Sequence, residues 1–152
     1  MEVKVKKLHP NATLPSYETA QAAAMDVRAF LETPKTLQPL ERAMIPTGLA
    51  FEIPEGYEMQ VRARSGLSIK HGITMVNGVG TIDADYRGEL NILVINLGQE
   101  AFEIEPDMRI AQLLVTKYET VAWQLTEELS ETARGAGGFG STGFVQKIDN
   151  KG

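Results

Sequence analysis

Short strand-like segments separated by glycine and proline turns occupy most of this 152-residue chain. Residues 57–64 follow the turn Pro-Glu-Gly and alternate apolar with polar side chains, which is the period of a half-buried strand. Residues 89–97 and 109–118 are also strand-like, and no helical period is sustained beyond one expected turn at 67–71. Many short strands with regular turns predict an all-β sandwich or barrel. Further strands are expected at 2–8, 43–53 and 121–125, the last as the final core strand.

The composition is that of a single globular domain, with 43% hydrophobic and 23% charged residues. A net charge of −5 argues against nucleic-acid binding through the whole surface, although a local basic site can still take a small anion. The chain has no cysteine, which excludes disulfides, thiolate chemistry and cysteine-ligated metals. Its only histidines, His9 and His71, leave little scope for a zinc site or a histidine-based triad.

No targeting or membrane-spanning segment is apparent in the sequence. Residues 1–10 alternate valine with lysine and lack an apolar core, and the longest apolar core run, residues 92–95, is far too short to cross a bilayer. We therefore expect a soluble protein that is cytoplasmic or otherwise intracellular and has no membrane partner.

Residues 78–88, Gly-Val-Gly-Thr-Ile-Asp-Ala-Asp-Tyr-Arg-Gly, carry two carboxylates between glycines. In an extended segment Asp83 and Asp85 point to one face, where their repulsion calls for a cation, a metal or a solvated edge. The glycines allow positive φ or a close backbone approach, as in a hairpin that holds a ligand. The alternative is a solvated hairpin with a polar tip, because aspartate and glycine are ordinary turn residues.

Residues 134–143, Arg-Gly-Ala-Gly-Gly-Phe-Gly-Ser-Thr-Gly, offer too little apolar bulk for a core, so we expect a mobile tail. They match G-x-G-x-x-G, but too few residues follow for a dinucleotide fold, and a P-loop would need lysine where Ser141 stands. Backbone N–H groups free of side chains can still wrap phosphate oxygens. Arg134 would add charge, Ser141 and Thr142 would add hydroxyl donors, and Phe139 would stack on a planar base. The alternative is a disordered terminal linker.

Three further signals lie elsewhere in the chain. Arg64 and Ser65 end a strand before Gly66, where the amides of a helical turn would favour an anion; the alternative is a solvated strand end. Gln112 is polar within an apolar strand, so it either pairs internally or reaches a ligand. Asp26 stands between two apolar residues and, taken alone, fits a solvent-facing strand position. Combined with the tail, these signals indicate phosphate binding, and the carboxylates suit Mg²⁺, which needs no histidine.

Five ordered segments, which span nearly the whole chain, make it resemble a trimeric deoxyuridine triphosphatase (dUTPase). They are residues 23–27, 64–68, 80–88 with Asn77 ahead of them, 109–113 and 134–143. The third and fifth segments are highly specific. Ala24, Ala63 and Asp107 stand where the family commonly has glycine, proline and glycine, and none of these departures removes a catalytic group.

The resemblance implies a distorted jelly-roll or β-barrel of the dUTPase type, with one short helix and a glycine-rich C-terminal tail. It implies a catalytic barrel domain at residues 1–130 and a flexible arm at 131–152 that closes the active site. It also implies a homotrimer in which three subunits share each site, the tail arriving from a neighbouring chain.

The implied reaction is Mg²⁺-dependent hydrolysis of dUTP to dUMP and pyrophosphate, which limits uracil incorporation into DNA and supplies dUMP for dTMP synthesis. Asp83 would be the general base that activates a water for attack on the α-phosphorus. Asp26 would help hold the Mg²⁺-triphosphate through a metal-bound water. Tyr86 would lie under the deoxyribose and leave no room for a 2′-hydroxyl.

The remaining implied contacts divide between the base and the phosphates. Uracil would be read by Asn77 and by the hairpin backbone at Gly80, Thr81 and Ile82. The phosphates would be contacted by Arg64, Ser65, Gly66 and Gln112. The tail would close the site through Arg134, Gly138, Phe139, Gly140, Ser141 and Thr142, with Phe139 stacked on uracil.

Two other functions remain open at this point. A dCTP deaminase shares the implied fold, but the Ala-Asp-Tyr sequence at 84–86 and the complete glycine tail favour the hydrolase. A nucleotide-dependent regulatory protein without turnover is the second alternative, and the presence of Asp83 argues against it.

Overall fold

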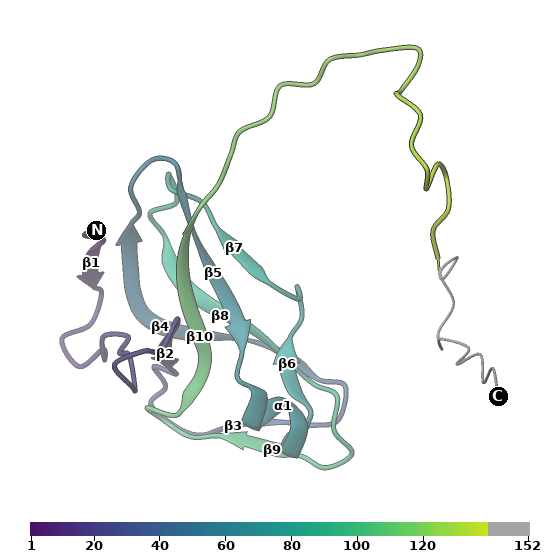
Figure 1. Ribbon diagram of the computed structural model, residues 1–152. Coiled ribbons are helices and arrows are strands. Elements are labelled where there is room, and N and C mark those ends of the chain that lie inside the picture. The colour runs from purple at the N-terminus through teal and green to yellow at the C-terminus, as the bar shows by residue number, and fades with distance from the viewer. Residues whose placement is uncertain (140–152) are drawn as a thin grey trace. The chain divides into compact units, whose positions relative to one another are not determined.

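The computed structural model describes residues 1–139, so the predicted contacts at Gly140, Ser141 and Thr142 lie outside the described residues. Ten short strands and one helix make up the regular structure of the described residues, and all of them lie within the first 117 residues (Figure 1). They are β1 (Lys4–Lys7), β2 (Met25–Arg28), β3 (Lys35–Leu37), β4 (Arg42–Glu52), β5 (Tyr57–Ala63), β6 (Ile73–Met75), β7 (Gly80–Ile82), β8 (Glu89–Asn96), β9 (Phe102–Ile104) and β10 (Arg109–Lys117), with one helix, α1 (Ser65–His71).

The strands form antiparallel sheets that bury a single core. One sheet has the order β1-β4-β8-β6, a second has the order β2-β10-β5-β7, and β3 pairs with β9. Residues from all three sheets meet in one apolar cluster, including Ile92 of the first, Leu113 of the second and Leu37 of the third, each fully buried. The predicted all-β fold with one short helix is therefore confirmed.

The strand-like segments of the sequence predict the long strands well. The expected strands at 57–64, 89–97 and 109–118 appear as β5, β8 and β10, each within one residue of the expected ends. Residues 57–64 are recognisable by clean alternation and the other two segments as apolar runs next to turn residues, and both signals are local properties of the sequence.

The expected final core strand at 121–125 is wrong. Among the described residues no strand follows Lys117, and Trp123 and Leu125 are 94% and 100% exposed. The segment has the composition of a strand, but composition gives only a preference, and a strand also needs a paired neighbour and a covered face.

Helix α1 connects β5 to β6 and ends at Gly72, which has the left-handed conformation with φ of 71°. The Gly72 N–H donates to the carbonyl of Ser68 at 3.0 Å and so caps the last turn. A Cβ at this position would lie 2.3 Å from the backbone nitrogen of Gly98, so only glycine fits.

By its internal packing the chain divides into two compact units, residues 1–119 and 120–152. The first unit contains every strand and helix of the described residues and the whole buried core. No helix in the described part is long and apolar enough to cross a membrane.

Candidate active site

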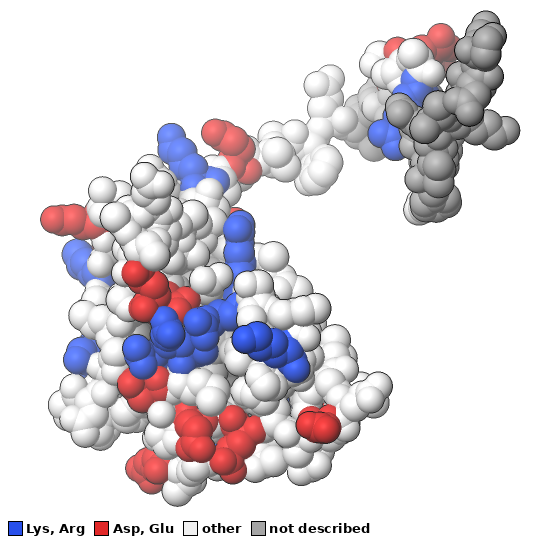
Figure 2. All heavy atoms as spheres, turned by 60° about the horizontal axis from the view of Figure 1, so that its bottom comes forward, with Lys and Arg blue, Asp and Glu red and all other residues white. Residues whose placement is uncertain are grey.

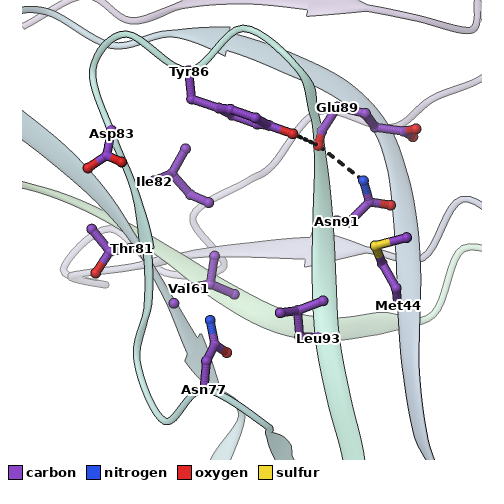
Figure 3. A pocket seen from close by; sticks show the side chains of 11 residues that line it. Met44, Val61, Asn77, Thr81, Ile82, Asp83, Tyr86, Glu89, Asn91 and Leu93 are labelled. Atoms are coloured by element: carbon purple, nitrogen blue, oxygen red, sulfur yellow. Dashed lines mark hydrogen bonds between the residues drawn. The ribbon is translucent and has the colours of Figure 1, made fainter.

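The predicted β-hairpin at 78–88 is wrong in one respect, because β7 pairs with β5 in one sheet and β8 pairs with β4 and β6 in the other, so the two strands do not pair with each other. Residues 77–88, which include the loop that crosses from β7 to β8 and which we continue to call the hairpin, border a cavity of about 260 Å³ together with β4, β5 and β8 (Figure 3). Its lining combines apolar side chains with an amide, a phenol and a carboxylate, which is the composition of a small-molecule site. The lining residues are Met44, Val61, Asn77, Gly80, Thr81, Ile82, Asp83, Tyr86, Glu89, Asn91 and Leu93. The structure therefore brings six of the predicted substrate and catalytic residues together.

The tip of this hairpin is held by its own hydrogen bonds. The Tyr86 N–H donates to the Asp83 carbonyl at 3.2 Å, and the Arg87 guanidinium donates to the Ala84 carbonyl at 2.6 Å. The Tyr86 hydroxyl donates to the Glu89 carbonyl at 3.0 Å, so the ring reaches across the tip toward β8 (Figure 3). Asp83 and Tyr86 thus line the pocket in a defined relative position.

At the other end of the hairpin, Gly80 leaves room for Asn77. Gly80 pairs with Val61 of β5, and a Cβ on Gly80 would lie 3.1 Å from the Val61 Cβ and 3.2 Å from the Asn77 amide nitrogen. The amide of Asn77 and the peptide groups of β7 offer donors and acceptors for the edge of a planar base.

A second cluster surrounds Asp26, whose side chain is only 4% exposed. One carboxylate oxygen lies 3.3 Å from Arg64 and 3.2 Å from Arg109, and the other accepts from the Gln112 amide at 3.1 Å. Asp26 and Gln112 face each other in the β2–β10 pairing, and Arg64 follows the end of β5. Asp26 is therefore a buried, fully paired carboxylate, and the expectation of a solvent-facing position is wrong.

Two arginines, Arg64 and Arg109, contact the Asp26 carboxylate despite the acidic net charge of the chain. Figure 2 shows Lys and Arg gathered across the middle of one face of the molecule, with Asp and Glu around them. Ser65 and Gly66 are exposed beside Arg64 in the first turn of α1. Such a surface suits an anionic ligand.

The sheet keeps the two clusters apart within one chain. Ile82 pairs with Met59, so Asp83 is level with Glu58 at the start of β5, whereas Arg64 lies six positions further along. At about 3.3 Å per residue the two positions are separated by about 20 Å. The Arg64 guanidinium also turns away from β7, because it donates to the Arg109 carbonyl on β10 at 2.8 Å.

Glu18 belongs to the second cluster, and the sequence gives no sign of it. Its carboxylate lies 2.7 Å from the Arg109 guanidinium and accepts from the Ser16 hydroxyl at 3.0 Å. Ser16 in turn bridges the edge strand β2 through two backbone hydrogen bonds with Asp26. These contacts form because the loop that contains Ser16 and Glu18 pairs with the edge of β2. A local sequence pattern cannot predict such a long-range contact.

The pocket is also lined by residues of β4 and β8. The sequence predicts these two strands but does not show which side of each strand faces the core and which faces the pocket. Met44 on β4 and Asn91 and Leu93 on β8 line it, and so does Glu89 at the start of β8. The sequence predicts these strands, but the pairing of β4 with β8 decides which of their side chains face the hairpin.

The departure at Asp107 has a local explanation. The residue adopts a left-handed φ of 61°, where glycine is the usual choice, and its carboxylate accepts from Arg28 and from the Thr13 hydroxyl, both at 2.9 Å. Ala63 pairs with Ala111 between β5 and β10, so its backbone keeps the regular strand register.

In the second unit the described part of the tail forms local turns. Arg134 donates to the Gly137 carbonyl at 2.7 Å, and the Gly137 N–H donates back to the Arg134 carbonyl at 3.1 Å. Gly138 is half-buried, and the ring of Phe139 is fully exposed.

We expect Gln112→Leu to lower the free energy of unfolding by about 1–3 kcal/mol, because it leaves an oxygen of the buried Asp26 without its amide donor. Gln60→Leu is a matched control, since Gln60 is also a strand glutamine that donates to a carboxylate, but its acceptor Glu58 is only half-buried. Thermal unfolding at one protein concentration compares the two variants. Equal destabilisation would contradict a special role for the Asp26 contact.

The comparisons with known proteins agree on one family. The family model described as dUTPase matches residues 10–143. A deoxyuridine 5′-triphosphate nucleotidohydrolase of Rickettsia felis is 52% identical over 143 residues, with 93% of this chain and 97% of the relative covered. The corresponding enzyme of Orientia tsutsugamushi (strain Boryong) is 49% identical over 147 residues, covering 95% of this chain and 99% of the relative.

Solved structures give the same answer for the fold. A mutant dUTPase of Staphylococcus bacteriophage 80alpha with dUpNHpp superimposes with a TM-score of 0.85 at 30% identity, covering 94% of this chain and 99% of that one. A mutant dUTPase from phage phi11 of S. aureus, described with a structural Mg(II) ion, gives a TM-score of 0.76 at 25% identity, covering 86% of this chain and 100% of that one. The predicted fold type is confirmed.

Proposed function

This chain belongs to the dUTPase family, and from that premise we propose that its hairpin pocket binds deoxyuridine and that Asp83 activates the attacking water. The protein is a dUTP diphosphatase, which hydrolyses dUTP to dUMP and pyrophosphate. This reaction limits uracil incorporation into DNA and supplies dUMP for dTMP synthesis. The observation that carries the site assignment is the convergence of Asp83, Tyr86 and Asn77 on one cavity.

In this assignment the hairpin recognises the nucleoside and begins the chemistry. Asn77 and the peptide groups of Gly80, Thr81 and Ile82 hydrogen-bond the edge of uracil, and Tyr86 packs under the deoxyribose. The Asp83 carboxylate takes a proton from a water aligned with the α-phosphorus, and the protein accelerates the reaction mainly by positioning.

The Asp26 cluster supplies the phosphate-binding half of the site. Arg64 and Gln112 contact phosphate oxygens, together with Ser65 and Gly66 at the start of α1. Their arrangement around one carboxylate supports this role, because Asp26 holds both side chains at fixed positions.

Magnesium enters with the triphosphate as part of the substrate. The described residues contain no group of three or more His, Cys, Asp or Glu side chains that would hold a metal ion by themselves. Both oxygens of Asp26 already accept from Arg64, Arg109 and Gln112, which suits a contact to a metal-bound water better than direct ligation. When bound, the ion neutralises charge on the phosphates.

We assign each complete site to more than one subunit of a homotrimer. A nucleotide whose α-phosphorus lies at Asp83 cannot also reach the Arg64 of the same chain across about 20 Å of strand. A neighbouring copy can present its Asp26 cluster to the hairpin pocket, which supports the shared site. The trimer has no direct nucleic-acid or membrane partner in this proposal, and its location is intracellular.

The tail completes the site from a further chain. Residues 1–130 form the catalytic barrel domain, and residues 131–152 form the arm, in which Arg134, Gly138, Phe139, Gly140, Ser141 and Thr142 close over the substrate. The open ring of Phe139 and the turn at Arg134 support this assignment.

A stop codon in place of Arg134 should leave the fold intact and reduce turnover by about 100-fold or more, since closure positions the substrate. The melting temperature should stay unchanged, because every strand and every buried core residue that the structure describes lies within residues 1–117. A chain that ends after Gly143 is the matched control and should retain activity. Loss of activity in both truncations, or in neither, would contradict the role of residues 134–143.

The proposed function is tested by measuring pyrophosphate release from dUTP, UTP, dTTP and dCTP with Mg²⁺. We expect efficient release from dUTP alone. Ammonia release from dCTP would instead identify a deaminase, and binding of dUTP without pyrophosphate release would identify a protein without turnover.

A further inference from the structure

The ring of Tyr86 lies over a backbone position that has no room for a side chain. A Cβ on Gly88 would lie 2.3 Å from the Tyr86 hydroxyl oxygen, 2.6 Å from Cζ and 3.0 Å from Cε2. These distances are too short for any Cβ, so a side chain here would force the ring to move. Gly88 is therefore the surface on which the end of the tyrosine ring rests.

The hydroxyl of the same ring is fixed by the next residue. It donates to the Glu89 carbonyl at 3.0 Å, and that oxygen also accepts from the Asn91 amide at 3.1 Å (Figure 3). The position of the Tyr86 ring is thus determined by a steric contact with Gly88 and by a hydrogen bond to the Glu89 carbonyl.

Glu89 is itself anchored to the other side of the pocket. It pairs with Ala50 of β4, and its carboxylate accepts from the Gly48 N–H at 2.8 Å. Gly48 lies in an irregular part of β4 with φ of 68°, where a Cβ would lie 2.8 Å from the Ala12 Cβ. Since this segment is tightly packed, the Glu89 carbonyl is held in place by β4 and not only by the hairpin.

We propose that Gly88 and Glu89 are positioning residues that set how strongly the pocket discriminates deoxyribose from ribose. They hold the Tyr86 ring at one depth in the cavity, although the residue is 45% exposed and would otherwise be free to move. This inference rests on the proposed function, in which the sugar packs on that ring. Discrimination then depends on Gly88, which does not line the pocket, and on the Glu89 carbonyl, which accepts from the Tyr86 hydroxyl.

The test compares kcat/KM for dUTP and UTP in Gly88→Ala, Tyr86→Phe and the double variant. We expect Gly88→Ala to lower the dUTP/UTP ratio by about 10-fold, a change equivalent to 1.4 kcal/mol in relative transition-state binding. The double variant should regain part of the lost selectivity, because removing the hydroxyl removes the closest contact of the added methyl group. Val79→Ala, on the same hairpin and outside the pocket lining, is the control and should keep the wild-type ratio.

The ratio separates positioning from general damage, since a poorly folded variant loses activity toward both nucleotides equally. An equal loss for dUTP and UTP in Gly88→Ala, or a double variant no more selective than Gly88→Ala, would overturn the proposal.

If Gly88→Ala does not fold, the Tyr86→Phe variant tests the proposal instead, because it adds no atoms and removes the hydrogen bond that fixes the end of the ring. Its ratio should fall by about 3-fold or more, and an unchanged ratio would overturn the proposal. A wild-type protein that releases no pyrophosphate from dUTP would refute the proposed function instead.

Discussion

Asp83→Asn should reduce the turnover of dUTP by about 10²–10⁴-fold, the usual contribution of a positioned general base. Asparagine has nearly the same shape but cannot take a proton from water at neutral pH. The fold should be unaffected, because only the backbone carbonyl of Asp83 makes the turn contact, to the Tyr86 N–H. Steady-state pyrophosphate release with saturating Mg²⁺ and dUTP measures the loss.

Two controls accompany the Asp83→Asn variant: its affinity for a nucleotide analogue, and the turnover of a variant that lacks the nearby Asp85 carboxylate. Affinity for dUpNHpp should be retained within a few fold, since Asp83 acts on the water more than on the nucleotide. Asp85→Asn removes a carboxylate from the same turn that does not line the pocket, and its loss of turnover should stay below about 10-fold. Turnover of Asp83→Asn close to that of the wild type would exclude the general-base role.

Mixing two inactive chains should restore activity if subunits share the sites. Asp83→Asn disables the hairpin half, and Arg64→Gln disables the phosphate-binding half. In mixed trimers some sites combine the intact hairpin of one chain with the intact Asp26 cluster of another. About a quarter of the sites should be competent in an equal mixture, because each site draws its halves from neighbouring chains at random.

The complementation experiment has a matched control within the same design. A chain carrying both substitutions, mixed with the Asp83→Asn chain, contains no intact Asp83 and should recover nothing. Chains with two different affinity tags allow mixed trimers to be purified before the assay. Verified mixed trimers without recovery would show that a single chain builds each site, in spite of the distance between its two clusters.

The pattern of the sequence predicted those elements that depend on near neighbours. Strand β5 was recognisable from its alternation of apolar and polar residues, and β8 and β10 were recognisable as apolar runs next to turn residues. The apolar segment at 121–125 was also predicted as a strand and yet remains exposed, with Leu125 fully accessible. Alternation reports a capacity to pair, and pairing itself requires a partner strand that a local pattern cannot supply.

The candidate site was predictable as a set of residues but not as an arrangement. Asp83 was singled out by the two carboxylates of residues 78–88, and Asn77 and Tyr86 by the resemblance to the dUTPase motif, and all three line one pocket. Asp26 fitted a solvent-facing position when taken alone, whereas the β2–β10 register buries it against Gln112. Glu18 carried no signal, because its contact with Arg109 spans 91 positions in the chain.

The sequence by itself determined the all-β class and the principal strands, since composition, strand-like runs and turn residues act over short range, and its resemblance to the five dUTPase motifs indicated the residues for nucleotide chemistry. Only the tertiary structure decided which of these residues meet. The pairing of β5 with β7 at one end and with β10 along its length separates Asp83 from Arg64. Strand register is set by long-range packing of the core, and it is this register that divides the site into two halves within one chain.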